Sequence, residues 1–227
     1  MDSDDENGGF DLAKFNEILS KAFLFINAYL LQSATNEVVI YGSFSHEAIF
    51  LGSKPDDLAN NKKSDAVSFK NYERFSTKLL SKIISLYKDE DFMERMAANT
   101  FGNFSKIGSA LKKSNWFINS WKQNNSRVDT ILNSRIMIFQ ASGDNNDDYN
   151  SMVNSIFAWK KNSVMIDSIM YHEKDSILLQ QCAYLTGGIY TRTLDSEEFI
   201  NCLFMGNYLM GNESDFLWPF ELLWFLF

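Results

Sequence analysis

The amino-acid sequence predicts one α/β domain with a mostly parallel sheet and helices on both faces. Apolar, β-branched segments recur along the chain, and in the C-terminal half amphipathic helical patterns separate them. A repeated strand–helix order needs crossover connections, which make consecutive strands parallel and cover the sheet on both sides. The apolar fraction of 45% in 227 residues is enough for a sizeable core.

The N-terminal half contains helices and one hairpin. Residues 1–11 are acidic and polar, so we expect a disordered leader. Apolar residues at helical spacing predict a helix over 15–31. Two short β-branched runs, 37–41 and 48–51, are joined by a short Gly-Ser connection and predict a hairpin. After a polar loop, the same helical spacing predicts three more helices, over 72–87, 91–99 and 107–123.

The C-terminal half alternates strands and helices. The continuous apolar run 136–140 is typical of a central parallel strand, and 163–171 and 189–192 predict two more. Asp175 is the expected N-cap of one intervening helix, and Gly187 with the next glycine is expected to end it. The helices predicted between and after these strands cover 148–161, 175–185 and 196–209.

Composition argues against several classes of function. The net charge of -8 lacks the excess of basic residues with which nucleic-acid-binding domains neutralise phosphates. Two cysteines and two histidines, far apart in the sequence, cannot form a four-ligand zinc site. No signal peptide and no apolar run of the roughly 20 residues needed for a membrane span is visible. We therefore expect neither direct nucleic-acid binding nor membrane association.

No catalytic or cofactor motif is recognisable. The chain has no phosphate loop, dinucleotide fingerprint or nucleophile elbow. Asp144, Asp147 and Asp148 follow the strand at 136–140, at the edge where doubly wound sheets bind ligands. These carboxylates could ligate Mg²⁺ or cap helix N-termini. Because no other loop supplies obvious ligands, we favour capping and predict no metal site, no catalytic residue and no cofactor.

Four short motifs within 134–190 resemble a known family. A strand opening with Ser-Arg-Ile leads to an Asn-x-Ile-Phe-Ala-x-x-Lys helix, an Ile-Asp strand and a Leu-Gln-Gln-x-x-x-x-Thr-Gly-Gly-Ile-Tyr segment. This order is similar to the thirty-four-kilodalton subunit family of transcription factor TFIIH, whose fold is von Willebrand A-like. The matching residues are Ser134, Arg135, Ile136, Asn154, Ile156, Phe157, Ala158, Lys161, Ile166, Asp167, Leu179, Gln180, Gln181, Thr186, Gly187, Gly188, Ile189 and Tyr190.

The resemblance implies a non-catalytic scaffold subunit of the TFIIH core. It places the protein in the nucleus, in transcription initiation by RNA polymerase II and in nucleotide excision repair. The family binds the zinc-containing region of the forty-four-kilodalton subunit, so that subunit and other TFIIH core subunits are the expected partners. Two alternatives stay open. A metal-dependent von Willebrand A ligand-binding domain would need a D-x-S-x-S motif, and a small doubly wound enzyme would need one of the missing catalytic motifs.

The helix over 148–161 is the expected partner-binding element. Its apolar stripe should face the sheet, whereas tryptophan and lysine lie off that stripe, and tryptophan is enriched in interface hot spots. The stripe consists of residues 149, 152, 153, 156 and 157. The expected partner-binding residues are Ala158, Trp159, Lys160 and Lys161.

The chain departs from the family at both ends. No apolar strand precedes the helix at 15–31, no D-x-S-x-S is present, and the family's cysteine-rich zinc module has no counterpart. We therefore predict a leader (1–11), a von Willebrand A-like domain lacking the first strand (12–210) and an apolar tail of uncertain origin (211–227). Because that first strand is central in the family, the sheet should either have a gap or pair 37–41 directly with 136–140. Both arrangements predict low stability.

Overall fold

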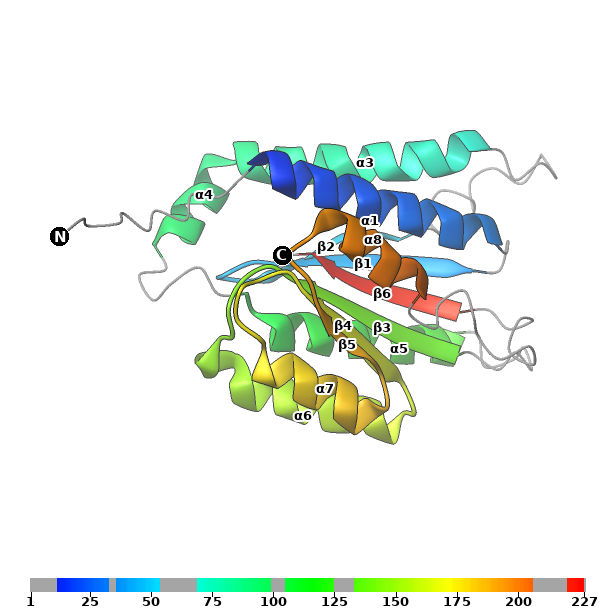
Figure 1. The fold of residues 1–227 in the computed structure, drawn as a ribbon, viewed down its shortest axis with the longest axis vertical. Coiled ribbons are helices and arrows are strands. Elements are labelled where there is room, and N and C mark those ends of the chain that lie inside the picture. Colours follow the sequence, from blue (N-terminus) through cyan, green and yellow to red (C-terminus); the bar gives the residue numbers. More distant parts are fainter. Residues whose placement is uncertain are drawn as a thin grey trace.

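The computed structural model describes residues 12–32, 36–53, 69–98, 105–124, 133–205 and 220–226. In chain order the elements are α1 (Leu12–Gln32), β1 (Glu37–Ser43), β2 (Ala48–Ser53), α3 (Phe69–Lys88), α4 (Glu90–Ala97), α5 (Ile107–Asn124), β3 (Asn133–Gln140), the short 3-10 helix η1 (Asn146–Asp148), α6 (Tyr149–Lys161), β4 (Met165–Met170), α7 (Ile177–Thr186), β5 (Tyr190–Arg192), α8 (Ser196–Met205) and β6 (Phe220–Leu226). One sheet lies between two layers of helices (Figure 1).

The sheet has the strand order β2-β1-β6-β3-β4-β5. Only the β1–β2 hairpin is antiparallel, and every other neighbouring pair is parallel. Helices α1, α3 and α8 pack on one face, and α5, α6 and α7 pack on the other. Along β1, Val38 and Ile40 face the core under α1, α3 and α8, while Val39 and Tyr41 face the core under α5, α6 and α7. Because both faces of the strand are buried, residues 38–41 are apolar throughout and do not alternate with polar ones. The predicted α/β class is confirmed.

The centre of the sheet is occupied by β6, from the segment that we predicted to be a tail. Leu223 of β6 pairs in parallel register with Val39 of β1 and with Ile136 of β3. Both predicted arrangements, a gap and direct pairing of 37–41 with 136–140, are therefore wrong. A β-prone segment inserted here gives both flanking strands partners for their backbone N–H and C=O groups. The predicted low stability rested on those unpaired edges and loses its basis.

The ends of α7 show one correct and one incorrect sequence prediction. Gly187 ends the helix in the left-handed conformation, with φ of 78°, as expected for a glycine C-cap. The N-cap is Ser176, whose Oγ accepts a hydrogen bond from the N–H of Leu179 at 3.0 Å, and not Asp175. Asp175 instead accepts from the hydroxyl of Tyr190 at 2.9 Å. Both adjacent residues are good caps, and sequence alone does not distinguish them.

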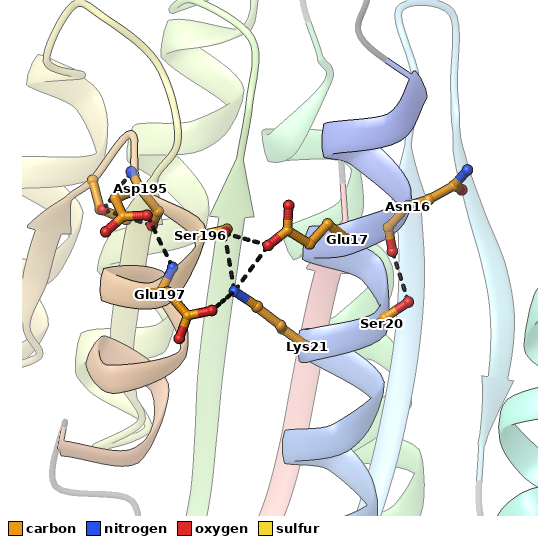
Figure 2. A network of polar contacts seen from close by, with 8 residues as sticks. Asn16, Glu17, Ser20, Lys21, Asp195, Ser196 and Glu197 are labelled. Atoms are coloured by element: carbon orange, nitrogen blue, oxygen red, sulfur yellow. Dashed lines mark hydrogen bonds and ion pairs between the residues drawn. The ribbon is translucent and has the colours of Figure 1, made fainter.

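Helix α1 is fixed to α8 by a polar network (Figure 2). Lys21 Nζ donates to Ser196 Oγ at 2.9 Å and to Glu197 Oε1 at 2.8 Å, and it lies 3.1 Å from Glu17 Oε1. The hydrogen bond to Glu197 raises the pKa of Lys21, and the hydrogen bond from Ser196 lowers the pKa of Glu17. On its other side α1 packs against α3, so α1 lies between α8 and α3 (Figure 1).

Several sequence predictions concern residues outside the described ranges. They include the acidic leader (1–11), most of the polar loop after β2 (54–68) and the first part of the tail (211–219). Among the helices that the structure describes, none has the length and apolar character required to cross a membrane.

Candidate functional site

The acidic loop after β3 lies at the carboxyl edge of the sheet and caps two helices, one on each side of α6. Asp144 accepts hydrogen bonds at the N-terminus of α7, from Ser176 Oγ and, at 3.3 Å, from the N–H of Leu178. Asp148 accepts from the N–H of Gly108 at 2.5 Å, at the N-terminus of α5. The capping interpretation is confirmed for Asp144 and Asp148, which cap α7 and α5. Asp147 and Asp148 also lie in the first turn of η1, and Asp148 stands at the N-cap position of α6 without a side-chain cap hydrogen bond to it.

Gly108 allows α5 to approach this loop closely. A Cβ atom there would lie 2.8 Å from the backbone nitrogen of Met152 and 2.6 Å from Ser151 Oγ. Both distances are shorter than van der Waals contact, so a larger residue would push α5 away from α6. The close approach also partly buries Asp148, and this burial raises the pKa of its carboxyl despite the hydrogen bond from Gly108.

A small, open hollow of about 10 Å³ lies beside the loop and is lined in part by Gln140, Asp144 and Asp148. Gln140 Nε2 donates to the carbonyls of Ser142 at 2.7 Å and Gly143 at 2.9 Å, which holds the loop against the end of β3. Across the described ranges, no three His, Cys, Asp or Glu side chains gather as a metal site would require. The carboxylates facing the hollow therefore serve mainly as helix caps.

Asp148 provides a test of this capping role. Asp148→Asn keeps an oxygen acceptor for Gly108 without a buried charge, so we expect it to be at least as stable as wild type at neutral pH. Asp148→Ala loses the acceptor and should cost about 1 kcal/mol. Because the folded-state pKa of Asp148 is raised, its stability contribution is present at low pH and lost as pH rises through that pKa.

Wild type should therefore gain stability relative to Asp148→Asn as pH falls from about 7 to about 4. Urea unfolding followed by circular dichroism at several pH values measures this difference. An advantage of wild type that grows toward neutral pH would show that the charge itself is required.

Some of the residues that carry the family resemblance, from three of the four motifs, meet at a buried ion pair. Asp167 on β4 accepts from Arg135 Nε on β3 and, at 2.7 Å, from the N–H of Ile189 before β5. Arg135 and Asp167 are 8% and 2% exposed. A Cβ on Gly188 would overlap the carbonyl oxygen of Ile166, so only glycine fits there. The motif therefore joins three adjacent strands and is structural.

The predicted partner-binding residues of α6 do not share one face. Lys160 and Lys161 are exposed and Ala158 is half-buried, whereas Trp159 is fully buried in the core. Trp159 therefore cannot be a surface hot spot, which corrects the prediction. Phe157, which we expected to face the sheet, is exposed instead. The buried row of α6 is Met152, Ser155, Ile156 and Trp159.

Helix α7 adds exposed side chains that the sequence analysis did not single out. Tyr184 is 86% and Ile177 is 65% exposed, and Phe157 on the neighbouring α6 is 55% exposed. Ile177 and Tyr184 are seven residues apart, so they share one side of α7, away from buried Leu179 and Cys182. This spacing of seven residues between Ile177 and Tyr184 is the sequence signal from which a shared side of α7 could be predicted. We call the outer side of these two adjacent helices the α6–α7 face (Figure 1).

Helices α6 and α7 themselves carry no negative charge. No Asp or Glu occurs within α6 or α7, and the only charged residues in the two helices are Lys160 and Lys161 at the end of α6. In a chain of net charge -8 this combination of exposed aromatic and basic residues is unusual. Aromatic enrichment and depletion of acidic residues are typical of the core of a protein–protein interface.

Fold and topology together define a von Willebrand A-like α/β domain. A solved structure described as the TFIIH p34 N-terminal domain aligns with a TM-score of 0.63 at 21% identity, covering 82% of this chain and 83% of that one. The sequence model of the family "Transcription factor Tfb4" matches residues 5–215. The chain therefore belongs to the Tfb4 family, and the resemblance stated from the four motifs is confirmed.

Curated relatives agree with this assignment. General transcription factor IIH subunit 3 of Dictyostelium discoideum is 26% identical over 212 residues, 88% of this chain and 54% of that protein. General transcription and DNA repair factor IIH subunit tfb4 of Schizosaccharomyces pombe is 25% identical over 196 residues, 84% of this chain and 61% of that protein. The chain thus spans little more than half the length of these relatives.

Proposed function

We propose that this chain is a non-catalytic, nuclear component of TFIIH that acts in RNA polymerase II transcription and nucleotide excision repair. The family assignment supports the complex, because the curated relatives carry TFIIH subunit names. The α6–α7 face supports the role of a binding module. Asp144 and Asp148, at the carboxyl edge of the sheet, already cap α7 and α5. Their capping role supports our proposal that they are neither catalytic residues nor ligands of a resident metal.

The partner on the α6–α7 face is, in this proposal, the zinc-containing region of the forty-four-kilodalton TFIIH subunit. Phe157, Ile177 and Tyr184 would supply apolar contact area, and Lys160 and Lys161 would supply positive charge at one end. Large exposed aromatic residues bury much surface at low entropic cost, so they suit the centre of such an interface. The lysines would speed association with an acidic partner surface.

The single observation that carries this proposal is the 86% exposure of Tyr184 beside an uncharged helix face. We expect Tyr184→Ser combined with Phe157→Ser to weaken binding of the forty-four-kilodalton subunit by about 30-fold or more, as for a hot spot of at least ~2 kcal/mol. Lys161→Glu should weaken binding less and mainly slow association. Isothermal titration calorimetry and stopped-flow fluorescence measure these two effects.

Met93→Ser is the matched control. Met93 is an exposed apolar residue on α4, next to Phe92, which packs on Phe44 between β1 and β2. In the strand order this hairpin is at the opposite edge of the sheet from β4 and β5. The substitution should leave the affinity unchanged. Wild-type affinity in the double variant would exclude this face, and no binding by the wild-type chain would exclude the partner.

A further inference from the structure

Strand β2 is the longer of the two strands at the edges of the sheet. It pairs with β1 on one side and has no strand on its other side among the described residues. Its six residues, Ala48–Ser53, are mostly apolar and contain no charged side chain, whereas β5, at the opposite edge, has only three residues. A long, uncharged edge strand is a template for pairing with another chain, and natural proteins protect such edges.

The hairpin register shows which backbone groups of β2 point away from β1. The N–H of Phe44 donates to the carbonyl of Glu47 at 2.8 Å and closes the hairpin. Because hydrogen-bonded and non-hydrogen-bonded pairs alternate in an antiparallel ladder, Ala48 and Phe50 direct their N–H and C=O groups to the open side. The ladder shifts register after Phe50, so these two are the outward-facing residues of its regular part.

Two lysines, one from each helical layer, donate to both of these outward carbonyls. Lys82 of α3 donates from Nζ to the carbonyl of Phe50 at 2.6 Å, and Lys113 of α5 donates from Nζ to the carbonyl of Ala48. Helices α3 and α5 cover opposite faces of the sheet, so the two side chains reach one edge from both faces (Figure 1). Lys82 Nζ also lies 5.3 Å from the centre of the Phe50 ring, which adds a cation–π contact.

A strand that approached this edge would have to displace both ammonium groups. Its N–H groups would need the carbonyls of Ala48 and Phe50, which already accept charge-assisted hydrogen bonds, and these are stronger than bonds between neutral groups. Two copies of the chain that met edge to edge would also bring four ammonium groups into one seam, where like charges repel.

We propose that the β2 edge is a latent self-association surface, which Lys82 and Lys113 hold closed to a second copy of this chain. The contact that they prevent is a two-fold β2–β2 pairing, in which the same surface serves both copies. The edge lies at the opposite end of the strand order from β4 and β5. Its protection is therefore independent of the partner proposed for the α6–α7 face.

Replacing both lysines tests the proposal with the full 227-residue chain. Lys82→Gln with Lys113→Gln removes both charges but keeps polar side chains, so it adds no apolar surface. We expect sedimentation velocity to show dimers or larger species, with a dissociation constant lower than that of wild type by about tenfold or more. In hydrogen-exchange mass spectrometry, residues 44–53 should gain protection as the variant associates, because the outward N–H groups of Ala48 and Phe50 then pair.

Lys88→Gln with Lys112→Gln is the matched control. It removes two exposed lysines from the same two helices, α3 and α5. Each glutamine pair makes the net charge of -8 more negative by two, which by itself opposes self-association. The control should therefore sediment like wild type. Lys82→Arg with Lys113→Arg keeps both charges and hydrogen-bond donors and should also sediment like wild type.

Three outcomes would overturn the proposal. A folded Lys82→Gln, Lys113→Gln variant that sediments like wild type would show that the lysines do not close the edge. Equal association by the control pair would attribute the effect to lost charge in general, and association without protection of residues 44–53 would place the contact on another surface. Circular dichroism checks folding. If the double variant does not fold, the single variant Lys113→Gln, which should associate to an intermediate degree, gives the same test.

Discussion

Replacing Asp167 with alanine is expected to lower the free energy of unfolding by about 3–5 kcal/mol, the loss typical of breaking a buried ion pair from one side. The substitution would leave the guanidinium of Arg135 buried without its carboxylate, and the N–H of Ile189 without its acceptor. The guanidinium lies between neighbouring strands and is buried, so water cannot readily replace its lost partner. Urea unfolding followed by tryptophan fluorescence and circular dichroism measures the loss.

The double variant Arg135→Met with Asp167→Leu separates the charge from the packing. Removing both partners leaves no uncompensated charge, so most of the stability should return, with only the Ile189 N–H unsatisfied. Asp167→Asn should fall between the two. A double variant as unstable as Asp167→Ala would mean that packing, and not the unpaired charge, dominates the loss.

The second large effect concerns the strand at the centre of the sheet. Leu223→Pro should destabilise the domain by about 3 kcal/mol or more, because proline removes an N–H and its ring disturbs a strand paired on both sides. Leu223 is in register with Val39 on one side and Ile136 on the other. The same unfolding experiment applies, and exposure of apolar surface can be followed with a hydrophobic dye.

Leu223→Val is the matched control, because it keeps the backbone N–H and a β-prone side chain. It should unfold close to wild type. If Leu223→Pro were as stable as Leu223→Val, β6 would not contribute to the sheet in solution. The arrangement expected from the sequence, with β1 and β3 unpaired or joined directly, would then return.

The sequence was sufficient for the elements whose signal is local. The hairpin at 37–51 and the strand at 136–140 are apolar β-branched runs, and the observed β1, β2 and β3 contain them. The helix at 15–31 was predicted from apolar spacing and is α1, extended at both ends. These patterns report burial of the segment itself, so they need no knowledge of what lies beside it.

Two errors have different causes, one distant in the sequence and one local. The sequence prediction follows the family order, in which the central strand is N-terminal, and therefore leaves the strand-forming residues of the tail outside the sheet. In α6, Ser155 occupies a core position, with its Oγ hydrogen-bonded to the carbonyl of Ser151 at 2.8 Å. A polar residue in the buried row shifted the predicted stripe toward Phe157 and left Trp159 outside it.

The sequence predicts the role of the acids in the candidate site but not the helices that they cap. Acids after a strand of a doubly wound fold suggested capping, and Asp144 and Asp148 are caps. The capped helices, α7 and α5, come from other parts of the chain, and local sequence does not reveal which helix N-terminus a loop will meet. The exposure of Tyr184 likewise depends on how α7 packs against β4.

The position of β6 also determines when the domain can finish folding during its synthesis. The ribosome makes β1 through β5 before it makes β6, yet β6 lies between β1 and β3. While residues 220–226 are still in the exit tunnel, the emerging chain has a β1–β2 half and a β3–β4–β5 half without the strand that joins them. Such long-range pairing folds slowly, and the two open edges are the surfaces that a chaperone would have to protect.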